Sequence, residues 1–334
     1  MATGGRWFLP WLTLLSGTMA ASAAAHAGDA EWRSYGRDYT EQRFSPLGSI
    51  SRRNVARLGL QWWLDLPEET ALVATPLMVD GTLYFSGKFG VVYAVDARTG
   101  RQNWRYDPQS IAELNRLPAR LTINMGMTRG VAIADGRLFV GTPDGRLIAL
   151  DCASGRELWS VQTFDRATPR YISGAPLAFR GKVLIGHGGG DFGAVRGYVT
   201  AHDAVTGREL WRFYTVPGNP AAGFENQAMA MAARTWTGEW WKFGGGGTVW
   251  NAMTYDAELG RVYLGTGNGA PWNQRVRSPG GGDNLFLASI VALDAETGEY
   301  RWHYQENPGE SWDYNSAMDI VLTDLQIDGK SRKV

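Results

Sequence analysis

Five side chains that could hold a metal ion and a flat cofactor occupy similar places along the chain. They lie beside short apolar segments, and they are Arg129, Asp191, Trp250, Asn268 and Asp313. Carboxylate and amide oxygens are the hard ligands that Ca²⁺ prefers. A tryptophan face can stack on a planar group, and an arginine can bind an anionic group with two parallel hydrogen bonds. These residue types therefore predict a site for a cation and an anionic, planar cofactor.

Glycines adjoin this set of side chains. A glycine has no Cβ, so the backbone can approach a bound molecule closely at that position. Four glycines precede Asp191, and they are Gly186, Gly188, Gly189 and Gly190. We expect the last three to line the cofactor pocket.

Each of these side chains also has an interpretation that requires no ligand. Asp191 could be an exposed loop carboxylate, and Arg129 could form a surface ion pair. Trp250 could pack between sheets, and Asn268 could be an ordinary turn residue. His187 has no partner histidine nearby in the sequence, so we interpret it as structural.

A repeat, Asp-x-x-Ser/Thr-Gly-x-x-x-Trp, organises the elements that must position the site. Each copy follows a short apolar segment typical of a strand. The Asp and Ser/Thr side chains favour a turn by bonding nearby backbone, and the glycine supplies a positive φ. The tryptophan then begins the next strand and can pack between neighbouring sheets. The four copies run from Asp96 to Trp104, Asp151 to Trp159, Asp203 to Trp211 and Asp294 to Trp302.

The spacing of the repeat predicts an all-β fold, a β-propeller with about four blades in this chain. Successive repeat tryptophans are 55, 52 and 91 residues apart, and a period near 50 with several strands per unit is typical of propeller blades. A hairpin signal precedes each copy, at Asp80-Gly81, Asp135-Gly136, Arg180-Gly181 and Asp256 to Gly260. We assign the longest interval to two inserted loops, 217–248 and 267–283, and such loops usually carry function.

The blade pattern also predicts where the site lies. If the first strand of each hairpin is innermost, the residues before it gather at one end of the central channel. That rule brings Arg129, Trp250 and Asp313 together, and Asp191 and Asn268 follow the second strands of their hairpins. Residues 319–334 look like the start of another blade, so we interpret residues 28–334 as the N-terminal part of a longer propeller domain.

The N-terminal residues predict export. Arg6 precedes an apolar run from Trp7 to Leu15, and Ala25-His26-Ala27 has the small residues of a cleavage site, so residues 1–27 read as a signal peptide. No other segment is apolar and long enough to cross a membrane. The 33 basic and 33 acidic residues balance, which offers no electrostatic case for binding nucleic acid. The single cysteine, Cys152, excludes an internal disulfide.

Several segments resemble the quinoprotein alcohol dehydrogenases of the methanol and ethanol dehydrogenase type, which use pyrroloquinoline quinone (PQQ). The likeness runs from about Trp32 to Val334. The segments that carry it are 39–47 (YTEQRFSPL), 224–250 (with TWTGEWWKFGGGGTVW), 265–272 (GTGNGAPW), 278–287 (SPGGGDNLFL) and 312–314 (WDY). The family fold is an eight-bladed propeller, and this chain matches about its first half.

The resemblance implies a role for each candidate residue. Trp250 would lie under the quinone plane, and Asp313 would be the catalytic base, flanked by aromatic residues that limit water. Cofactor contacts would come from Arg129, Ser173, Thr248 and Trp250, and the glycine pattern adds Gly188, Gly189 and Gly190. The metal ligands would be Asp191, Asn268 and Asp313.

The chain departs from the family pattern in several places. Asp191 stands where the family usually has a glutamate, and its stretch has one extra residue. Ile123 and Asn124 occupy the place of two adjacent cysteines, and Val73 that of a cofactor-contacting glutamate. Lanthanide-using members have an aspartate two residues after the catalytic one, whereas this chain has Asn315, which favours Ca²⁺.

The resemblance implies a periplasmic enzyme that oxidises alcohols to aldehydes by hydride transfer to PQQ, with Ca²⁺ as a Lewis acid. A periplasmic cytochrome c or similar protein would accept the electrons. The sequence has no Cys-x-x-Cys-His motif, so this portion attaches no c-type haem. Two alternatives stay open at this point: a non-catalytic periplasmic propeller scaffold, and a degenerate quinoprotein that binds its cofactor weakly. A sugar-oxidising quinoprotein is a third, which the 238–242 and 265–268 segments disfavour.

Overall fold

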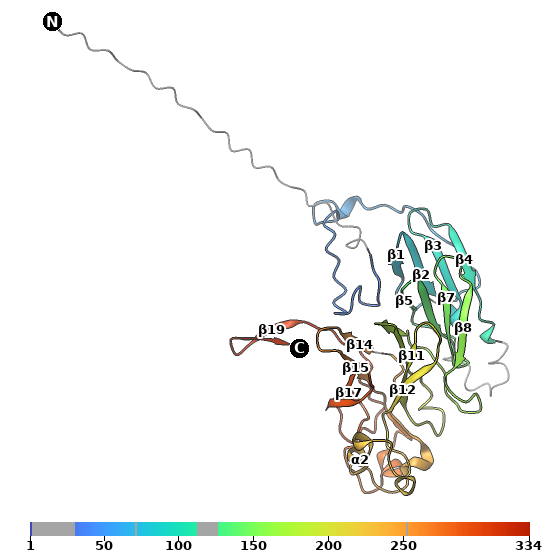
Figure 1. Cartoon of the computed structure of the whole chain (residues 1–334), viewed down its shortest axis with the longest axis vertical. Helices are drawn as coiled ribbons and strands as arrows, with labels where there is room; N and C mark the ends of the chain where they lie inside the picture. The colour runs from blue at the N-terminus through green and yellow to red at the C-terminus, as the bar shows by residue number, and fades with distance from the viewer. Residues whose placement is uncertain (2–30, 71, 112–125, 252) are drawn as a thin grey trace.

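Four antiparallel four-stranded sheets form the body of the protein. The computed structural model describes Met1 and residues 31–70, 72–111, 126–251 and 253–334, so the expected signal peptide and positions 123 and 124 lie outside the described residues. The sheets follow one another around an arc, as blades do (Figure 1). A two-stranded hairpin follows the fourth sheet.

The strands of each sheet run in chain order, which confirms the blade pattern. The first sheet contains β1 (Leu77–Val79), β2 (Thr82–Ser86), β3 (Val92–Asp96) and β4 (Gln102–Tyr106). The second contains β5 (Ala132–Ala134), β6 (Arg137–Gly141), β7 (Arg146–Asp151) and β8 (Glu157–Gln162). The third contains β9 (Leu177–Phe179), β10 (Lys182–Ile185), β11 (Tyr198–Asp203) and β12 (Glu209–Tyr214). The fourth contains β14 (Met253–Asp256), β15 (Arg261–Gly265), β17 (Ser289–Asp294) and β18 (Tyr300–Gln305), and the final hairpin is β19 (Asp324–Ile327) with β20 (Lys330–Lys333).

The two turn types predicted from the sequence are present. Asp80 and Gly81 join β1 to β2 with φ of 47° and 73°, a geometry that suits a two-residue hairpin. In the repeat turn, Oδ1 of Asp96 accepts hydrogen bonds from the backbone N–H and the hydroxyl of Thr99, both at 2.8 Å. Gly100 follows with a φ of 73°. The turn is therefore stabilised within five residues of sequence.

Three of the four repeat tryptophans pack on the turn of the next sheet, as the sequence predicted. A Cβ added to Gly155 would lie 2.7 Å from the ring of Trp104, and the Trp104 indole N–H donates to the carbonyl of Cys152 at 2.9 Å. The pairs Trp159–Gly207 and Trp211–Gly298 repeat this contact. Only glycine leaves room for the ring, so the glycine serves both the turn and the packing between sheets.

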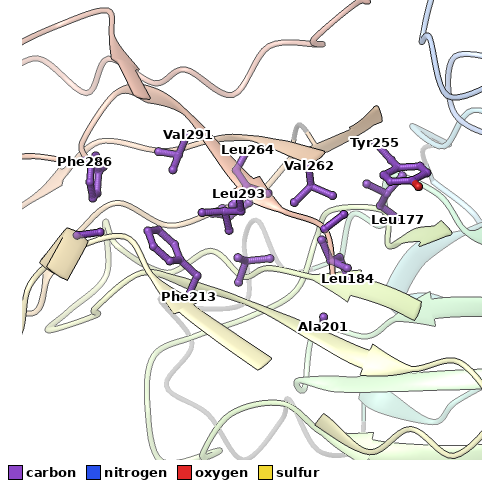
Figure 2. Packing of buried hydrophobic residues seen from close by; sticks show 14 of the residues in the cluster. Leu177, Leu184, Ala201, Phe213, Tyr255, Val262, Leu264, Phe286, Val291 and Leu293 are labelled. Atoms are coloured by element: carbon purple, nitrogen blue, oxygen red, sulfur yellow. The ribbon is translucent and has the colours of Figure 1, made fainter. Parts of the chain in front are cut away.

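The core lies between successive sheets. Leu177 and Leu184 of the third sheet meet Val262 and Leu264 of the fourth (Figure 2). The first strands of neighbouring sheets, β5 with β9 and β9 with β14, contact one another, so these strands are innermost. The prediction of where the site lies assumed that the first strand of each hairpin is innermost, and this arrangement confirms that assumption.

The first long insertion precedes β14 and the second follows β15, and the two insertions pair with each other. The first contains the 3-10 helix η5 (Pro220–Ala222), α2 (Gln227–Ala233), η6 (Trp240–Phe243) and β13 (Gly245–Gly246). The second contains β16 (Gly269–Ala270) and α3 (Gln274–Arg277). β13 pairs with β16. Two shorter 3-10 helices are η2 (Val55–Arg57) and η3 (Lys88–Gly90), and none of the described helices has the length and apolar character to span a membrane.

Candidate functional site

Backbone hydrogen bonds bring three distant segments to one end of the inner strands. The N–H of Gly267 donates to the carbonyl of Thr248 at 2.9 Å, and the N–H of Ser316 donates to the carbonyl of Thr266 at 3.0 Å. Gly247 donates to the carbonyl of Asn268 at 2.8 Å. The ends of both insertions and the segment after β18 therefore lie side by side, and they carry Trp250, Asn268 and Asp313.

Asp191 and Asn268, predicted as metal ligands, are in direct contact. The Nδ2 of Asn268 donates to Oδ1 of Asp191 at 2.7 Å. The indole N–H of Trp272 donates to the same oxygen at 2.9 Å. Asn268 is buried at 5% exposure, whereas Asp191 is exposed. The exposed carboxylate of Asp191 thus accepts a hydrogen bond from the buried side-chain amide of Asn268.

Asp313 lies in an unusual backbone conformation near Asp191. Its φ is 64°, a left-handed value that costs energy for a residue with a side chain. Partial burial raises the pKa of Asp313, and the nearby Asp191 carboxylate raises it further, while a hydrogen bond from Asn315 lowers it. The two carboxylates therefore share one electrostatic environment in which a cation would be favourable.

One expectation about Asp313 is wrong for this structure. Trp312 and Tyr314 do not shield it, because their exposed fractions are 81% and 55%. The backbone explains this orientation. Oε1 of Glu310 accepts hydrogen bonds from the N–H of both Trp312 and Tyr314, the latter at 3.1 Å, and the two side chains project outward from that turn.

Glu310 is a site residue that sequence reasoning missed. It is buried at 3% exposure, and its second oxygen accepts a hydrogen bond from the N–H of Gly269 at 2.9 Å. One carboxylate thus joins the loop of Asp313 to the strand that follows Asn268. Its only sequence signal is an acidic residue three positions before Asp313.

Arg129, Ser173 and Trp250 form a second group in the site. The Arg129 guanidinium lies 4.8 Å from the centre of the Trp250 ring, a cation–π contact. The backbone N–H and Nη1 of Arg129 both donate to the carbonyl of Ser173, at 2.9 and 3.4 Å. Burial lowers the pKa of Arg129, and among the described residues it has no carboxylate within ion-pair distance. The group therefore places a positive charge against an aromatic face, and the cofactor contacts of its three residues stay predictions.

Tyr171 connects the two groups and was also missed. Burial raises its pKa, the Asp191 carboxylate raises it further, and the Arg129 guanidinium lowers it. The tyrosine therefore lies within electrostatic reach of both charged residues. A tyrosine in a loop before a strand carries no sequence signal for such a position.

The predicted glycines serve the packing of the chain. A Cβ on Gly188 would lie 2.9 Å from the ring of Tyr171, and one on Gly189 would lie 2.3 Å from the carbonyl oxygen of Pro169. A Cβ on Gly190 would meet the Thr248 methyl at an ordinary 3.7 Å. The first two positions thus require glycine even without a ligand. Their cofactor contacts stay predictions, as does that of Thr248, which is buried at 3% exposure.

The donor set fits a hard cation only with help from other ligands. Among the described residues, no three His, Cys, Asp or Glu side chains come together. Asp191, Asn268 and Asp313 offer carboxylate and amide oxygens, which suit Ca²⁺. The amide of Asn268 presents its nitrogen to Asp191, so it must turn over for its oxygen to face a shared cation. Further oxygens would have to come from a bound cofactor or from water.

Arg277 anchors this end of the second insertion. It is fully buried, and its guanidinium donates to the carbonyls of Pro271 and Trp272 at 2.6 and 3.0 Å and to the carbonyl of Glu310. It also donates to Oδ1 of Asn284 at 3.3 and 3.2 Å. Burial lowers its pKa to about 10. A charge with so many acceptors fixes the loops that carry Asn268 and Asp313.

A cavity of about 470 Å³ lies between the N-terminal segment 31–41 and the inner strands β5, β9 and β14. Arg129 is the one predicted site residue in its lining, which also includes Tyr35, Asn251 and Asp319. The cavity extends along the first strands of the sheets. The cavity therefore meets the candidate site only at Arg129, and the position of the site at one end of a central channel stays a prediction.

The comparisons with known proteins decide the family. The profile described as "Glucose/ethanol/alcohol dehydrogenase, beta-propeller domain", of the PQQ type, matches residues 32–334. The chain belongs to this family. That result confirms the propeller fold and the resemblance stated from the motifs.

Similar proteins agree in sequence and in structure. Quinohemoprotein alcohol dehydrogenase ADH IIB of Pseudomonas putida is 52% identical over 316 residues, which are 94% of this chain and 45% of that protein. The solved structure of quinohemoprotein alcohol dehydrogenase ADHIIG from Pseudomonas putida HK5 matches with a TM-score of 0.87 and 50% identity, over 92% of this chain and 45% of that one. A europium-containing methanol dehydrogenase matches with a TM-score of 0.78 and 33% identity, over 91% and 54%. The chain therefore spans about half the length of these relatives.

Proposed function

We propose that this chain forms part of a PQQ- and Ca²⁺-dependent alcohol dehydrogenase that oxidises alcohols to aldehydes. The observation that carries the proposal is the convergence of Arg129 with Trp250 and of Asp191 with Asn268, with Asp313 within electrostatic reach. Members of the same family supply the precedent for the chemistry.

Two residues of the chain would seat the cofactor. Trp250 offers an aromatic face to the planar quinone. Arg129 offers an uncompensated positive charge to an anionic group of the cofactor. When bound, PQQ supplies the hydride acceptor and Ca²⁺ the polarising positive charge.

Asp313 would accept the proton of the substrate hydroxyl. It is exposed, so an alcohol can reach it, and its raised pKa makes it a better base than an ordinary aspartate. Asp191 and Asn268 would hold the metal beside it. Asn315 is neutral where lanthanide-using members have an aspartate, which favours the divalent over the trivalent ion.

The predicted signal peptide at residues 1–27 favours a periplasmic location. The electrons would pass there to a cytochrome c or a similar acceptor. Two of the relatives are named quinohemoproteins, which is consistent with haem as the next electron carrier. A degenerate quinoprotein is the second candidate, because Asp191 is short and no three acidic or imidazole ligands meet among the described residues.

The test uses the full-length protein, purified and supplied with PQQ and Ca²⁺. We expect reduction of an artificial dye with primary alcohols, dependent on both additions. After chelation, activity should return with Ca²⁺ and not with La³⁺. PQQ binding without turnover would favour the degenerate quinoprotein, and absence of any PQQ binding would favour the scaffold.

A further inference from the structure

Asn315 contacts three of the residues to which the proposed function assigns roles. Its Oδ1 accepts a hydrogen bond from the indole N–H of Trp250 at 3.0 Å and from the backbone N–H of Asn268 at 3.1 Å. Its Nδ2 donates to the carbonyl of Asp313 at 2.9 Å and to Oδ1 of Asp313 at 3.3 Å. One short side chain is thus hydrogen-bonded to the residue proposed to stack on the cofactor, to a proposed metal ligand and to the proposed base.

The bonding pattern requires an amide. Only a side-chain amide places an acceptor with two lone pairs beside a donor with two hydrogens. An aspartate would keep the bonds from Trp250 and Asn268, but it would lose the donors and repel Asp313. A leucine of similar volume would lose all four contacts.

The backbone at Gly267 leaves space for the side-chain amide of Asn315. A Cβ on Gly267 would lie 2.8 Å from Oδ1 of Asn315, closer than side-chain carbons normally approach. Asn315 itself is half-buried, so water competes weakly for its hydrogen bonds. The amide is therefore held in one orientation by both packing and bonding.

We propose that Asn315 is a positioning residue, which sets Trp250, Asn268 and Asp313 relative to one another and so couples the cofactor seat to the metal seat. The roles of those three residues rest on the proposed function. The contacts that Asn315 makes with them do not. Asn315 touches neither cofactor nor substrate in this proposal, and it acts through its neighbours.

The coupling has a measurable consequence. Oδ1 of Asn315 accepts hydrogen bonds from both Trp250 and Asn268. Its removal should therefore weaken the binding of PQQ and of Ca²⁺ together. Each lost hydrogen bond typically weakens a coupled equilibrium by about 5- to 10-fold. We therefore expect Asn315→Leu to raise the dissociation constants of both PQQ and Ca²⁺ by about 10- to 100-fold.

The control is Asn251→Leu. Asn251 is also half-buried, and its Nδ2 donates to the carbonyl of Ala317 at 2.8 Å. It therefore holds the same segment with one bond but does not contact the indole nitrogen of Trp250 or Asn268. In the full-length protein, PQQ and Ca²⁺ affinities are measured from the absorbance of bound PQQ. Hydrogen exchange of the backbone N–H of Asn268 is measured in the protein without cofactor.

The exchange measurement separates this proposal from the proposed function. In Asn315→Leu, the Asn268 amide should exchange at least about 10-fold faster, because its acceptor is lost. In Asn315→Asp and Asn251→Leu, it should stay within about threefold of the wild type, since the acceptor remains. If the wild type binds no PQQ, the proposed function fails, while the exchange rates still decide whether Asn315 positions Asn268.

Unchanged exchange of the Asn268 amide in Asn315→Leu, with both affinities within about threefold of the wild type, would overturn the proposal. If Asn251→Leu lowered both affinities as much as Asn315→Leu does, the proposal would also be overturned, since the effect would then come from the segment as a whole. If the leucine variant does not fold, Asn315→Ala is measured in its place. It removes the same contacts with a smaller side chain.

Discussion

The Nδ2 of Asn268 lies 2.7 Å from Oδ1 of Asp191, although 77 positions separate the two residues in the chain. Asp191 follows β10 of the third sheet, and Asn268 follows β15 of the fourth. The indole of Trp272 bonds to the same carboxylate oxygen. The candidate metal ligands therefore form one hydrogen-bonded unit across a blade boundary.

Replacement of Asp191 tests whether this unit binds the cation. Asp191→Asn keeps the shape and removes the negative charge, so we expect the Ca²⁺ affinity to fall by about 10-fold or more, since affinity follows ligand charge. Calcium titration of the full-length protein with PQQ measures this. Asp165→Asn, at an exposed turn outside the site, is the matched control. Equal calcium affinities for wild type and Asp191→Asn would remove Asp191 from the ligand set.

Replacement of Asp313 tests the assignment of the base. Asp313→Asn should lower kcat by about 10²- to 10⁴-fold, because proton transfer loses its acceptor, while PQQ stays bound with its absorbance intact. Asp319→Asn is the control, since Asp319 is an exposed carboxylate that pairs with Arg43 at 2.6 Å. Turnover per bound PQQ within about threefold of the wild type would show that Asp313 is not the base.

Arg277 should be essential for the stability of the site. Arg277→Met leaves the carbonyls of Pro271, Trp272 and Glu310 without their donor, so we expect the free energy of unfolding to fall by about 3 kcal/mol or more. Urea denaturation measures this change. Arg275→Met, on the exposed side of α3, should change it by less than about 0.5 kcal/mol. Similar effects of the two changes would contradict the anchoring role.

His187 should make stability depend on pH. The ring is buried at 2% exposure, its Nδ1 lies 3.0 Å from the carbonyl of Gly188, and its Nε2 has no hydrogen-bond partner among the described residues. Burial lowers its pKa from 6.5 to about 3, and the nearby Arg170 and Arg212 act in the same direction. Below pH 6.5 the unfolded chain therefore takes up a proton that the folded protein rejects, so stability is full above that pH and falls as the pH drops.

The expected size is about 1.4 kcal/mol of unfolding free energy lost one pH unit below the unfolded pKa. Urea denaturation at pH 7.5 and pH 5.5 measures the loss, and His187→Gln, which does not titrate, subtracts the contribution of all other groups. The pH-dependent loss should be smaller in His187→Gln by about that amount. The same loss in both proteins would mean that His187 does not titrate in this way.

Much of the fold could be predicted because its signals are local. The repeat turn is complete within Asp96, Thr99 and Gly100, and the hairpin turn within Asp80 and Gly81. Such contacts depend on residue types a few positions apart, which a sequence displays directly. The tryptophan packing followed from the same repeat, since each Trp and each turn glycine recur at a constant spacing.

The site could be predicted in part, because equal positions in successive blades lie at the same end of the channel. That rule brought Arg129 and Trp250 together, which the cation–π contact confirms. It also placed Asp191 beside Asn268. It said nothing of side-chain direction, and the expected shielding of Asp313 by Trp312 and Tyr314 was therefore wrong.

The sequence by itself determined the sheets and their order, because these follow from repeated residue types at constant spacing. It also indicated the family and the candidate ligands, through segments such as 224–250 and 265–272 that resemble that family. Only the tertiary structure decided that Asn315 joins Trp250 to Asn268, that Glu310 holds the turn of Asp313, and that Arg277 anchors both loops. The physical reason is the range of these contacts. Asn315 finds its partners 65 and 47 positions away, and the type of a polar residue does not reveal which distant donor or acceptor the folded chain will bring to it.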